Sequence, residues 1–216
     1  YADLLEMLEK YDLEKADDLL LDLGFSSEHL GESGRGFSFL RDEPLLMVYD
    51  RERTPAKELL LKLSERELAQ VIREFGGERF AGRIARAIKA RGQRKPIVSS
   101  GELGEVVVRA VPRTYERGRI HPATRTFQAL RIYANDELGN LQRALKNIPD
   151  VLARGGRVVC ISFHSLEDRL VKMHLRTFAK EGVMRVITKK PVTPSEEERK
   201  ENPRSRSAKL RAAVMI

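Results

Sequence analysis

An apolar run that changes abruptly into polar residues restricts the fold of this chain more than any other feature. Val158-Val159-Cys160-Ile161 predicts a buried strand, and the seven residues after Ser162, Phe163 to Arg169, include His, Ser, Glu, Asp and Arg. A helical pattern precedes the strand, and Arg154-Gly155-Gly156 predicts the turn between them. A helix, a turn, a buried strand and another helix are typical of an α/β sheet, which binds ligands where its strands end. The polar run therefore indicates a functional site.

Other segments extend this α/β pattern on both sides. Residues 18–22, Asp-Leu-Leu-Leu-Asp, predict a second short buried strand, which follows a helix predicted over 3–11. Apolar positions from Phe127 to Ile148 are three or four residues apart, so they predict one long amphipathic helix. Short strands are predicted near 186–187 and at 212–216, and together these elements predict an α/β core.

Residues 55–115 carry helix signals and no strand run. Ser64 and Glu67 have the spacing of a capping box, and Gly76-Gly77 supplies a stop for the helix between them. A second helix is predicted around Ile84, and a third begins at Ser99. We therefore expect core segments at 1–50 and 119–216 and an inserted helical domain at 51–118, for which the family resemblance given below implies substrate binding.

The charge of the chain favours a polyanionic partner. The formal net charge is +8, and two segments are strongly basic, 79–95 and 185–211. Basic segments suit nucleic acid because binding releases counterions from phosphates, although solvated helix faces are the alternative for each segment. No apolar run reaches the roughly 20 residues that a membrane helix needs. The single cysteine, Cys160, is expected to be a buried structural thiol, which weakly favours a reducing, cytoplasmic compartment.

Five motifs in order along the chain resemble the RsmH (MraW) family of bacterial ribosomal RNA methyltransferases. Together they span nearly all of the 216 residues, which makes the resemblance highly specific. They are Asp22-Leu23-Gly24-Phe25-Ser26-Ser27, Arg35-Gly36-Phe37-Ser38-Phe39, and the runs 121–131, 163–172 and 202–211.

The resemblance implies a Rossmann-like class I methyltransferase core, with the family's N-terminal strands and cofactor loop missing before Tyr1. It also implies methylation of cytidine N4 in 16S ribosomal RNA of the small ribosomal subunit, with S-adenosylmethionine as the cofactor. Two family positions that usually hold an acid and an arginine are Leu46 and Val48 here. A non-catalytic RNA-binding fragment or a degenerate paralogue of the family is the alternative, and an exposed sheet edge would favour a homodimer.

The candidate site residues follow from the motifs and their positions. The resemblance implies that Tyr1, Asp22 and His29 contact the cofactor, and Asp22, His164 and Ser165 are the candidate catalytic residues. A loop-capping carboxylate is the structural alternative for Asp22. Six arginines are expected to contact RNA, although Arg131 could equally pair with Glu137: Arg83, Arg86, Arg125, Arg131, Arg204 and Arg206.

Two other kinds of chemistry are not favoured. Ser165 directly follows His164, and adjacent side chains at a strand tip diverge, so a hydrolytic triad is not expected. Glu167 and Asp168 suit the positive end of a helix dipole, which is a structural role. The four histidines and the one cysteine show no metal-ligand spacing, and no metal site is predicted.

Overall fold

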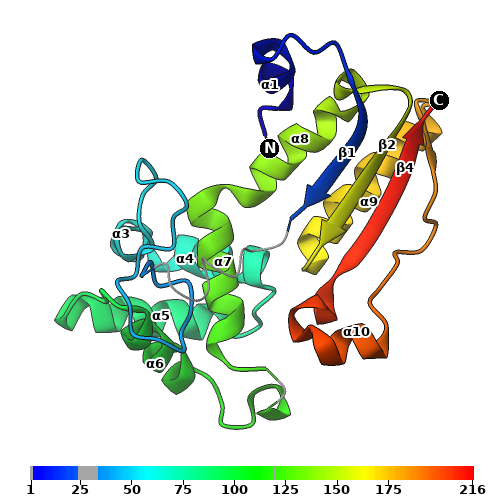
Figure 1. Cartoon of the computed structure of the whole chain (residues 1–216). Coiled ribbons are helices and arrows are strands. Elements are labelled where there is room, and N and C mark those ends of the chain that lie inside the picture. Colours follow the sequence, from blue (N-terminus) through cyan, green and yellow to red (C-terminus); the bar gives the residue numbers. More distant parts are fainter. Residues whose placement is uncertain (1, 24–33, 119) are drawn as a thin grey trace. The chain divides into compact units, whose positions relative to one another are not determined.

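The computed structural model describes residues 2–23, 34–118 and 120–216, which fall into two compact units (Figure 1). The first unit consists of Tyr1–Gly24 and Leu138–Ile216 and contains the sheet. The second unit, Phe25–Glu137, is helical, and the insertion predicted at 51–118 lies within it. The α/β prediction is therefore confirmed, and the arrangement is consistent with a Rossmann-like methyltransferase.

Four strands form the sheet in the order β1-β2-β4-β3. Strands β1 and β2 are parallel, with Leu19 opposite Val158 and Asp22 opposite Ile161. The other two pairings, β2 with β4 and β3 with β4, are antiparallel. The strand bounds are β1 (Ala16–Asp22), β2 (Leu152–Ser162), β3 (Met184–Val186) and β4 (Lys209–Met215).

Helices α8 and α9 share one hydrophobic cluster with the sheet. Leu145 of α8 and Val171 of α9 lie in this cluster with Val158 and Cys160 of β2. Burial raises the pKa of the Cys160 thiol to about 12, so this thiol stays protonated and structural, as predicted. The helical bounds in the first unit are α1 (Leu4–Lys10), α8 (Glu137–Val151, of which only the first residue is counted in the second unit), α9 (Ser165–Lys180), α10 (Glu196–Glu201) and the 3-10 helix η2 (Pro203–Ser207).

The second unit is held together by a separate apolar core. Leu68, Ile84, Leu103 and Leu130 come from four different helices and are fully buried in it. None of the helices in the described part of the chain is long and apolar enough to span a membrane. The bounds are α3 (Ala56–Lys62), α4 (Glu65–Gly76), α5 (Ala81–Arg94), α6 (Ser100–Ala110), the 3-10 helix η1 (Tyr115–Gly118) and α7 (Ala123–Asn135).

The capping box predicted at the start of α4 is confirmed. Ser64 Oγ accepts a hydrogen bond from the Glu67 amide at 3.2 Å, and the Glu67 carboxylate accepts one from the Ser64 amide at 2.8 Å. The helix ends at Gly77, whose φ of 63° lies in the left-handed region that glycine adopts readily. Local sequence signals set both ends of this helix.

The prediction of one long helix over 127–148 was wrong. Asp136 has a φ of 49°, and the chain forms α7 before it and α8 after it. The adjacent Asn135 side chain is buried, where its amide donates to the Met47 carbonyl at 2.7 Å and accepts from the Tyr49 amide at 2.8 Å. These bonds to a distant loop fix the helix end, and apolar spacing does not reveal them.

Two strand predictions also need correction. Gly155 and Gly156 do not form a turn before β2, because the strand runs through them with a register irregularity opposite residues 16–18. A Cβ at Gly156 would lie 2.8 Å from the Asp17 carbonyl oxygen, so the close approach of β1 requires glycine. β1 is not fully buried either: Leu21 is buried, but Leu20 is 65% exposed on an edge strand of the described sheet.

Candidate functional site

Asp22 and His164 follow neighbouring parallel strands. Asp22 ends β1 opposite Ile161 of β2, and the Leu23 amide donates to the Ile161 carbonyl at 2.9 Å. His164 comes two residues after the end of β2. The carboxyl ends of both strands therefore lie at one edge of the sheet, where α/β folds bind ligands. The Asp22 side chain is exposed at this edge, and its meeting with His164 in one pocket stays a prediction.

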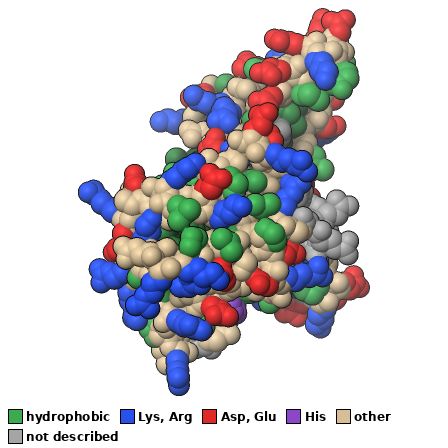
Figure 2. All heavy atoms as spheres, turned by 90° about the vertical axis from the view of Figure 1, so that its left-hand side faces the viewer, with side chains coloured by type: hydrophobic (Ala, Val, Ile, Leu, Met, Phe, Trp, Pro, Cys, Tyr) green, Lys and Arg blue, Asp and Glu red, His purple; other side chains and the backbone are tan. Residues whose placement is uncertain are grey.

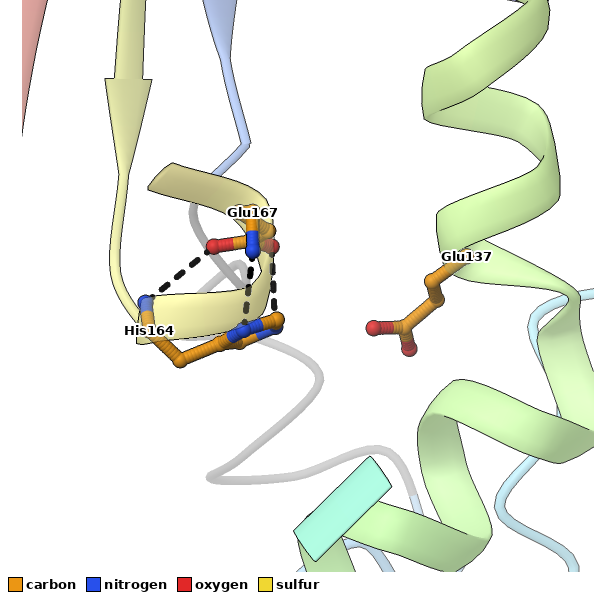
Figure 3. Close-up of side chains that lie close together, drawn as sticks. All are labelled: Glu137, His164 and Glu167. Carbon is orange, nitrogen blue, oxygen red and sulfur yellow. Dashed lines mark hydrogen bonds and ion pairs between the residues drawn. The ribbon is translucent and has the colours of Figure 1, made fainter. Parts of the chain in front are cut away.

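His164 caps helix α9, a role that the sequence analysis did not assign (Figure 3). Its Nδ1 accepts a hydrogen bond from the Glu167 amide at 3.4 Å. The Glu167 carboxylate in turn accepts from the Phe163 amide at 2.8 Å and the His164 amide at 3.2 Å. Because Nδ1 is an acceptor, the proton of the neutral imidazole is assigned to Nε2.

The His164 Nε2 atom is buried and makes no hydrogen bond to the described residues. It lies 3.2 Å from a Glu167 carboxylate oxygen, close enough for an ion pair when the ring is protonated, but the geometry is not that of a hydrogen bond. The Nδ1 contact thus fixes the position of the imidazole, and the Nε2 atom is shielded from solvent.

Asp168 anchors α9 to strand β4. Its carboxylate lies 2.7 Å from Arg211 Nε and 3.4 Å from Lys209 Nζ. Burial alone would raise the pKa of Asp168, but the Arg211 hydrogen bond and the charges of Arg211 and Lys209 outweigh it, so the pKa lies below the ordinary value of 3.8. Asp168 is therefore ionised at neutral pH, and its ion pair with Arg211 connects the start of α9 to β4.

A hollow of about 320 Å³ adjoins the start of α9. It brings together three residues that the sequence predicted, His164, Ser165 and Arg206. Thr193 and Lys209 also line it, and neither was predicted, although Lys209 lies in the basic motif at 202–211. The rest of the lining is Phe163, Ser207 and Ala208. The hydroxyls of Ser165 and Thr193 and the charges of Arg206 and Lys209 make this hollow suitable for an anion, although Lys209 also lies 3.4 Å from Asp168.

The predicted RNA-contacting arginines differ in their surroundings. Arg131 donates two hydrogen bonds to Glu137, at 2.9 and 3.0 Å, so it adopts the pairing left open by the sequence. Arg86 is exposed and lies 3.3 Å from Glu65, and the Arg83 guanidinium lies 5.8 Å from the centre of the Phe80 ring. Arg204 and Arg206 are exposed, and Arg125 is half-buried.

The remaining candidate positions lie outside the described residues or in apolar surroundings. Tyr1 and His29, the predicted cofactor contacts, fall outside the described ranges. Val48 is buried with Leu59 and Ala134, and Leu46 packs against the same small cluster. The two departures from the family pattern therefore fill an apolar contact in the second unit.

The chain is similar to known proteins over nearly its whole length. The chain matches the model of the MraW methylase family over residues 1–216. It is 50% identical over 212 residues to ribosomal RNA small subunit methyltransferase H of Rhodopirellula baltica, covering 97% of this chain and 64% of the relative. Proteins of the same name from Deinococcus deserti and Thermotoga neapolitana are 46% and 49% identical, and each alignment covers all of this chain and 70% or 71% of the relative. The chain thus spans about two thirds of the length of these relatives.

Proposed function

The chain belongs to the MraW methylase family, and from this premise we propose that it transfers a methyl group from S-adenosylmethionine to N4 of a cytidine in 16S ribosomal RNA. The resemblance found in the motifs is confirmed, and so is the methyltransferase class at the level of the family. The family match along the whole chain carries the proposal. We further propose the small ribosomal subunit as the partner, the cytoplasm as the compartment and a homodimer as the assembly.

The chemistry of N4 determines what the protein must supply. The N4 lone pair is delocalised into the cytosine ring, so the amine is a weak nucleophile. A catalyst has to hold the amine in line with the transferred methyl group and accept hydrogen bonds from it as it becomes tetrahedral. Orientation of this kind corresponds to effective molarities of up to about 10⁵–10⁸ M, and no covalent intermediate is needed. The cofactor, when bound, supplies the electrophilic methyl group.

Asp22 is the residue proposed to accept these hydrogen bonds. It combines an exposed carboxylate with a position at the carboxyl end of a parallel strand. A carboxylate there fits both the target amine and the hydroxyl and amino groups of S-adenosylmethionine, all of which are donors. Tyr1 and His29 are proposed to contact the same cofactor. In this scheme Asp22 orients the amine and stabilises the positive charge that develops on it.

His164 and Ser165 are proposed to border the target nucleotide at the hollow beside α9. The Glu167 cap holds the His164 ring in place, and the exposed Ser165 offers a hydroxyl next to it. Arg206 and Lys209 in the same lining suit the phosphate of that nucleotide. Arg204, Arg83, Arg86 and Arg125 are proposed to make further phosphate contacts, whereas Arg131 would first have to leave Glu137.

A methyl-transfer assay tests the proposal. The purified chain would be incubated with small ribosomal subunits that lack the modification and with isotope-labelled S-adenosylmethionine, and N4-methylcytidine measured by mass spectrometry. We expect Asp22→Asn to lower kcat about 10²-fold or more. The matched control is Asp18→Asn on the same strand, whose exposed carboxylate lies 3.9 Å from Arg157. Equal activities of the two variants would contradict the role of Asp22.

The alternative, a non-catalytic RNA-binding protein, gives a different result in one further measurement. Calorimetry of the chain with S-adenosylmethionine alone would then show no binding, while salt-dependent binding to ribosomal RNA persists. Binding of the cofactor, abolished or weakened by Asp22→Asn, would support the enzyme.

A further inference from the structure

A second hollow, of about 290 Å³, lies between α5 and α6 in the helical unit. We propose that it binds one nucleotide of single-stranded RNA, with the phosphate on its arginines and the base on its apolar floor. The choice of RNA as the partner rests on the proposed function. The residues that line the hollow are Ala87, Ala90, Arg91, Arg94, Val106, Arg109 and Ala110.

The floor of this hollow is made of small apolar side chains. Ala87 and Ala90 of α5 and Val106 and Ala110 of α6 present methyl groups there. Small residues on both helices leave room that larger side chains would fill. A flat, weakly polar ring can cover these methyl groups and remove apolar surface from water. A nucleobase satisfies this requirement, and a bare inorganic anion does not.

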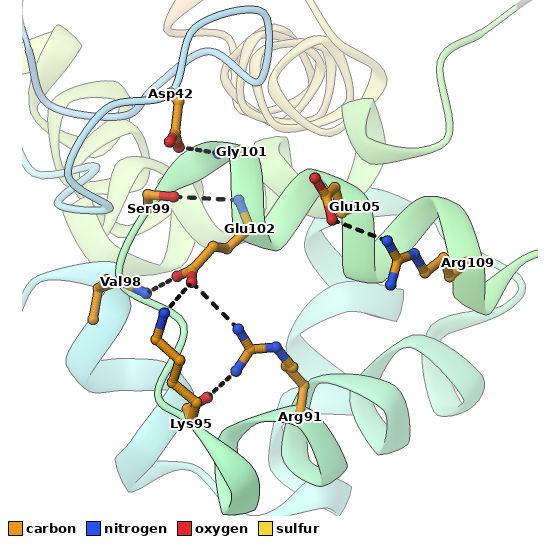
Figure 4. A network of polar contacts seen from close by, with 9 residues as sticks. All are labelled: Asp42, Arg91, Lys95, Val98, Ser99, Gly101, Glu102, Glu105 and Arg109. Atoms are coloured by element: carbon orange, nitrogen blue, oxygen red, sulfur yellow. Dashed lines mark hydrogen bonds and ion pairs between the residues drawn. The ribbon is translucent and has the colours of Figure 1, made fainter.

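Arg91 is held at the hollow by a network of polar contacts (Figure 4). Its guanidinium lies 3.3 Å from a Glu102 carboxylate oxygen and also donates to the Lys95 carbonyl. Glu102 is itself fixed, because its other carboxylate oxygen accepts from the Val98 amide at 2.9 Å. This backbone bond, more than the burial that opposes it, lowers the pKa of Glu102, so the carboxylate remains charged and keeps Arg91 in place. Arg91 is thus pre-arranged, with 31% of its side chain exposed.

Arg94 and Arg109 are available for a ligand. Arg94 is exposed and has no hydrogen-bond or ion-pair partner in the described part of the chain. Arg109 lies 3.2 Å from Glu105, but these side chains are 80% and 71% exposed, so water screens the pair strongly. A phosphate can therefore replace Glu105 at little cost and accept two hydrogen bonds from the guanidinium.

The charge around the hollow is positive. Four basic side chains lie at or beside it, Arg91, Arg94, Lys95 and Arg109, against two acidic ones, Glu102 and Glu105, which leaves a net charge of +2. Figure 2 views the face that carries α5 and α6, and Lys and Arg side chains are spread over this face. Three guanidinium groups beside an apolar floor suit a nucleotide in particular. The planar group stacks on bases and bonds phosphate oxygens in pairs, and single-stranded RNA is recognised in this way.

Binding of a fluorescent single-stranded RNA oligonucleotide to the full chain, measured at several salt concentrations, tests the proposal. The double variant Arg94→Ala/Arg109→Ala is expected to weaken binding about tenfold or more, and to reduce the slope of log affinity against log salt by about 0.7 for each phosphate that the variant no longer binds. The matched control is Arg66→Ala/Arg73→Ala, which removes two exposed arginines of α4 from the same unit. This control is expected to change the affinity less than threefold.

A variant without a charge change tests the floor of the hollow. Ala90→Leu fills the space and is expected to weaken binding at least threefold while the salt slope stays the same. Nucleoside monophosphate is expected to compete with the oligonucleotide at lower concentrations than inorganic phosphate. Equal loss in the two double variants, an unchanged affinity of Ala90→Leu, or equal competition by inorganic phosphate would overturn the proposal.

The outcome is separable from that of the proposed function. Methyl transfer by the wild-type chain combined with unchanged RNA binding in Arg94→Ala/Arg109→Ala refutes this subsite and leaves the enzyme in place. Loss of RNA binding in that variant, in a chain that transfers no methyl group, supports the subsite and refutes the enzyme. Circular dichroism checks the fold, and if the double variant does not fold, Arg94→Ala alone decides, because that side chain has no partner to lose within the described residues.

Discussion

Helices α4 and α9 begin with the same arrangement of hydrogen bonds in very different surroundings. At α4, Ser64 and Glu67 form a capping box on the surface of the helical unit. At α9, His164 and Glu167 form the same box, but only 12% and 7% of their side chains are exposed. The spacing of the two residues in the capping box determines where each helix begins. Burial determines how much free energy of unfolding is lost when an interaction at that helix start is removed.

Each helix start also carries an ion pair to a neighbouring element. Glu65 of α4 lies 3.3 Å from Arg86, with side chains 47% and 78% exposed. Asp168 of α9 lies 2.7 Å from Arg211, with side chains 12% and 8% exposed. An exposed pair contributes little because water solvates both charges, but a buried charge that loses its partner has no such compensation. Replacing one partner of each pair therefore tests whether burial makes the start of α9 matter more for stability than the start of α4.

Replacing the arginine of each pair is expected to give the largest difference. Arg211→Met leaves the Asp168 carboxylate buried with Lys209 alone, at 3.4 Å, and should lower the free energy of unfolding of the sheet unit by about 3 kcal/mol. Arg86→Met removes the same charge from an exposed pair and should cost less than about 1 kcal/mol. Urea unfolding followed by circular dichroism measures both. Similar losses of unfolding free energy in the two variants would show that burial of the Asp168–Arg211 pair does not add to its contribution to stability.

Low pH is expected to lower the free energy of unfolding of the sheet unit by protonating Asp168, and by less than Arg211→Met lowers it. The pKa of Asp168 is lower in the folded chain than its ordinary value of 3.8. Its stabilising contribution is therefore fully present above that value and is lost as the pH falls through the lower, folded-state pKa. The free energy of unfolding of the wild type should fall more steeply below about pH 4 than that of Arg211→Met. Parallel curves for the two proteins would contradict this linkage.

The start of α4 could be predicted from the sequence because its signals are local. Ser, Glu and Gly stand at the spacings that cap and end a helix, and the structure places the helix between them. The capping role of His164 was missed because histidine is not among the usual N-cap residues. Glu167, three residues later, was the available signal, since it stands where a capping box requires an acid.

Errors in the fold prediction arose from contacts between distant segments. The break at Asp136 accompanies the bonds of Asn135 to Met47 and Tyr49, which are more than 80 residues away. Gly155 and Gly156 resembled a turn, but pairing with β1 keeps them within a strand. The positions of Asp22 and His164 at one edge of the sheet could be predicted, because parallel neighbouring strands end together. The pairing of Asp168 with Arg211 depends on β4, which lies 41 to 47 residues further along the chain.

A serine in place of His164 separates the cap from any role in catalysis, and it is expected to have the smallest effect on stability. Ser64 already accepts a hydrogen bond from the third residue of its helix, so a serine can serve Glu167 in the same way. We expect His164→Ser to be more stable than His164→Ala by about 1 kcal/mol. If the imidazole borders the target nucleotide, both variants should lose methyl transfer to a similar extent, although only His164→Ala lacks the cap. If His164→Ser is both more stable and more active in methyl transfer than His164→Ala, the only role of His164 is to cap α9.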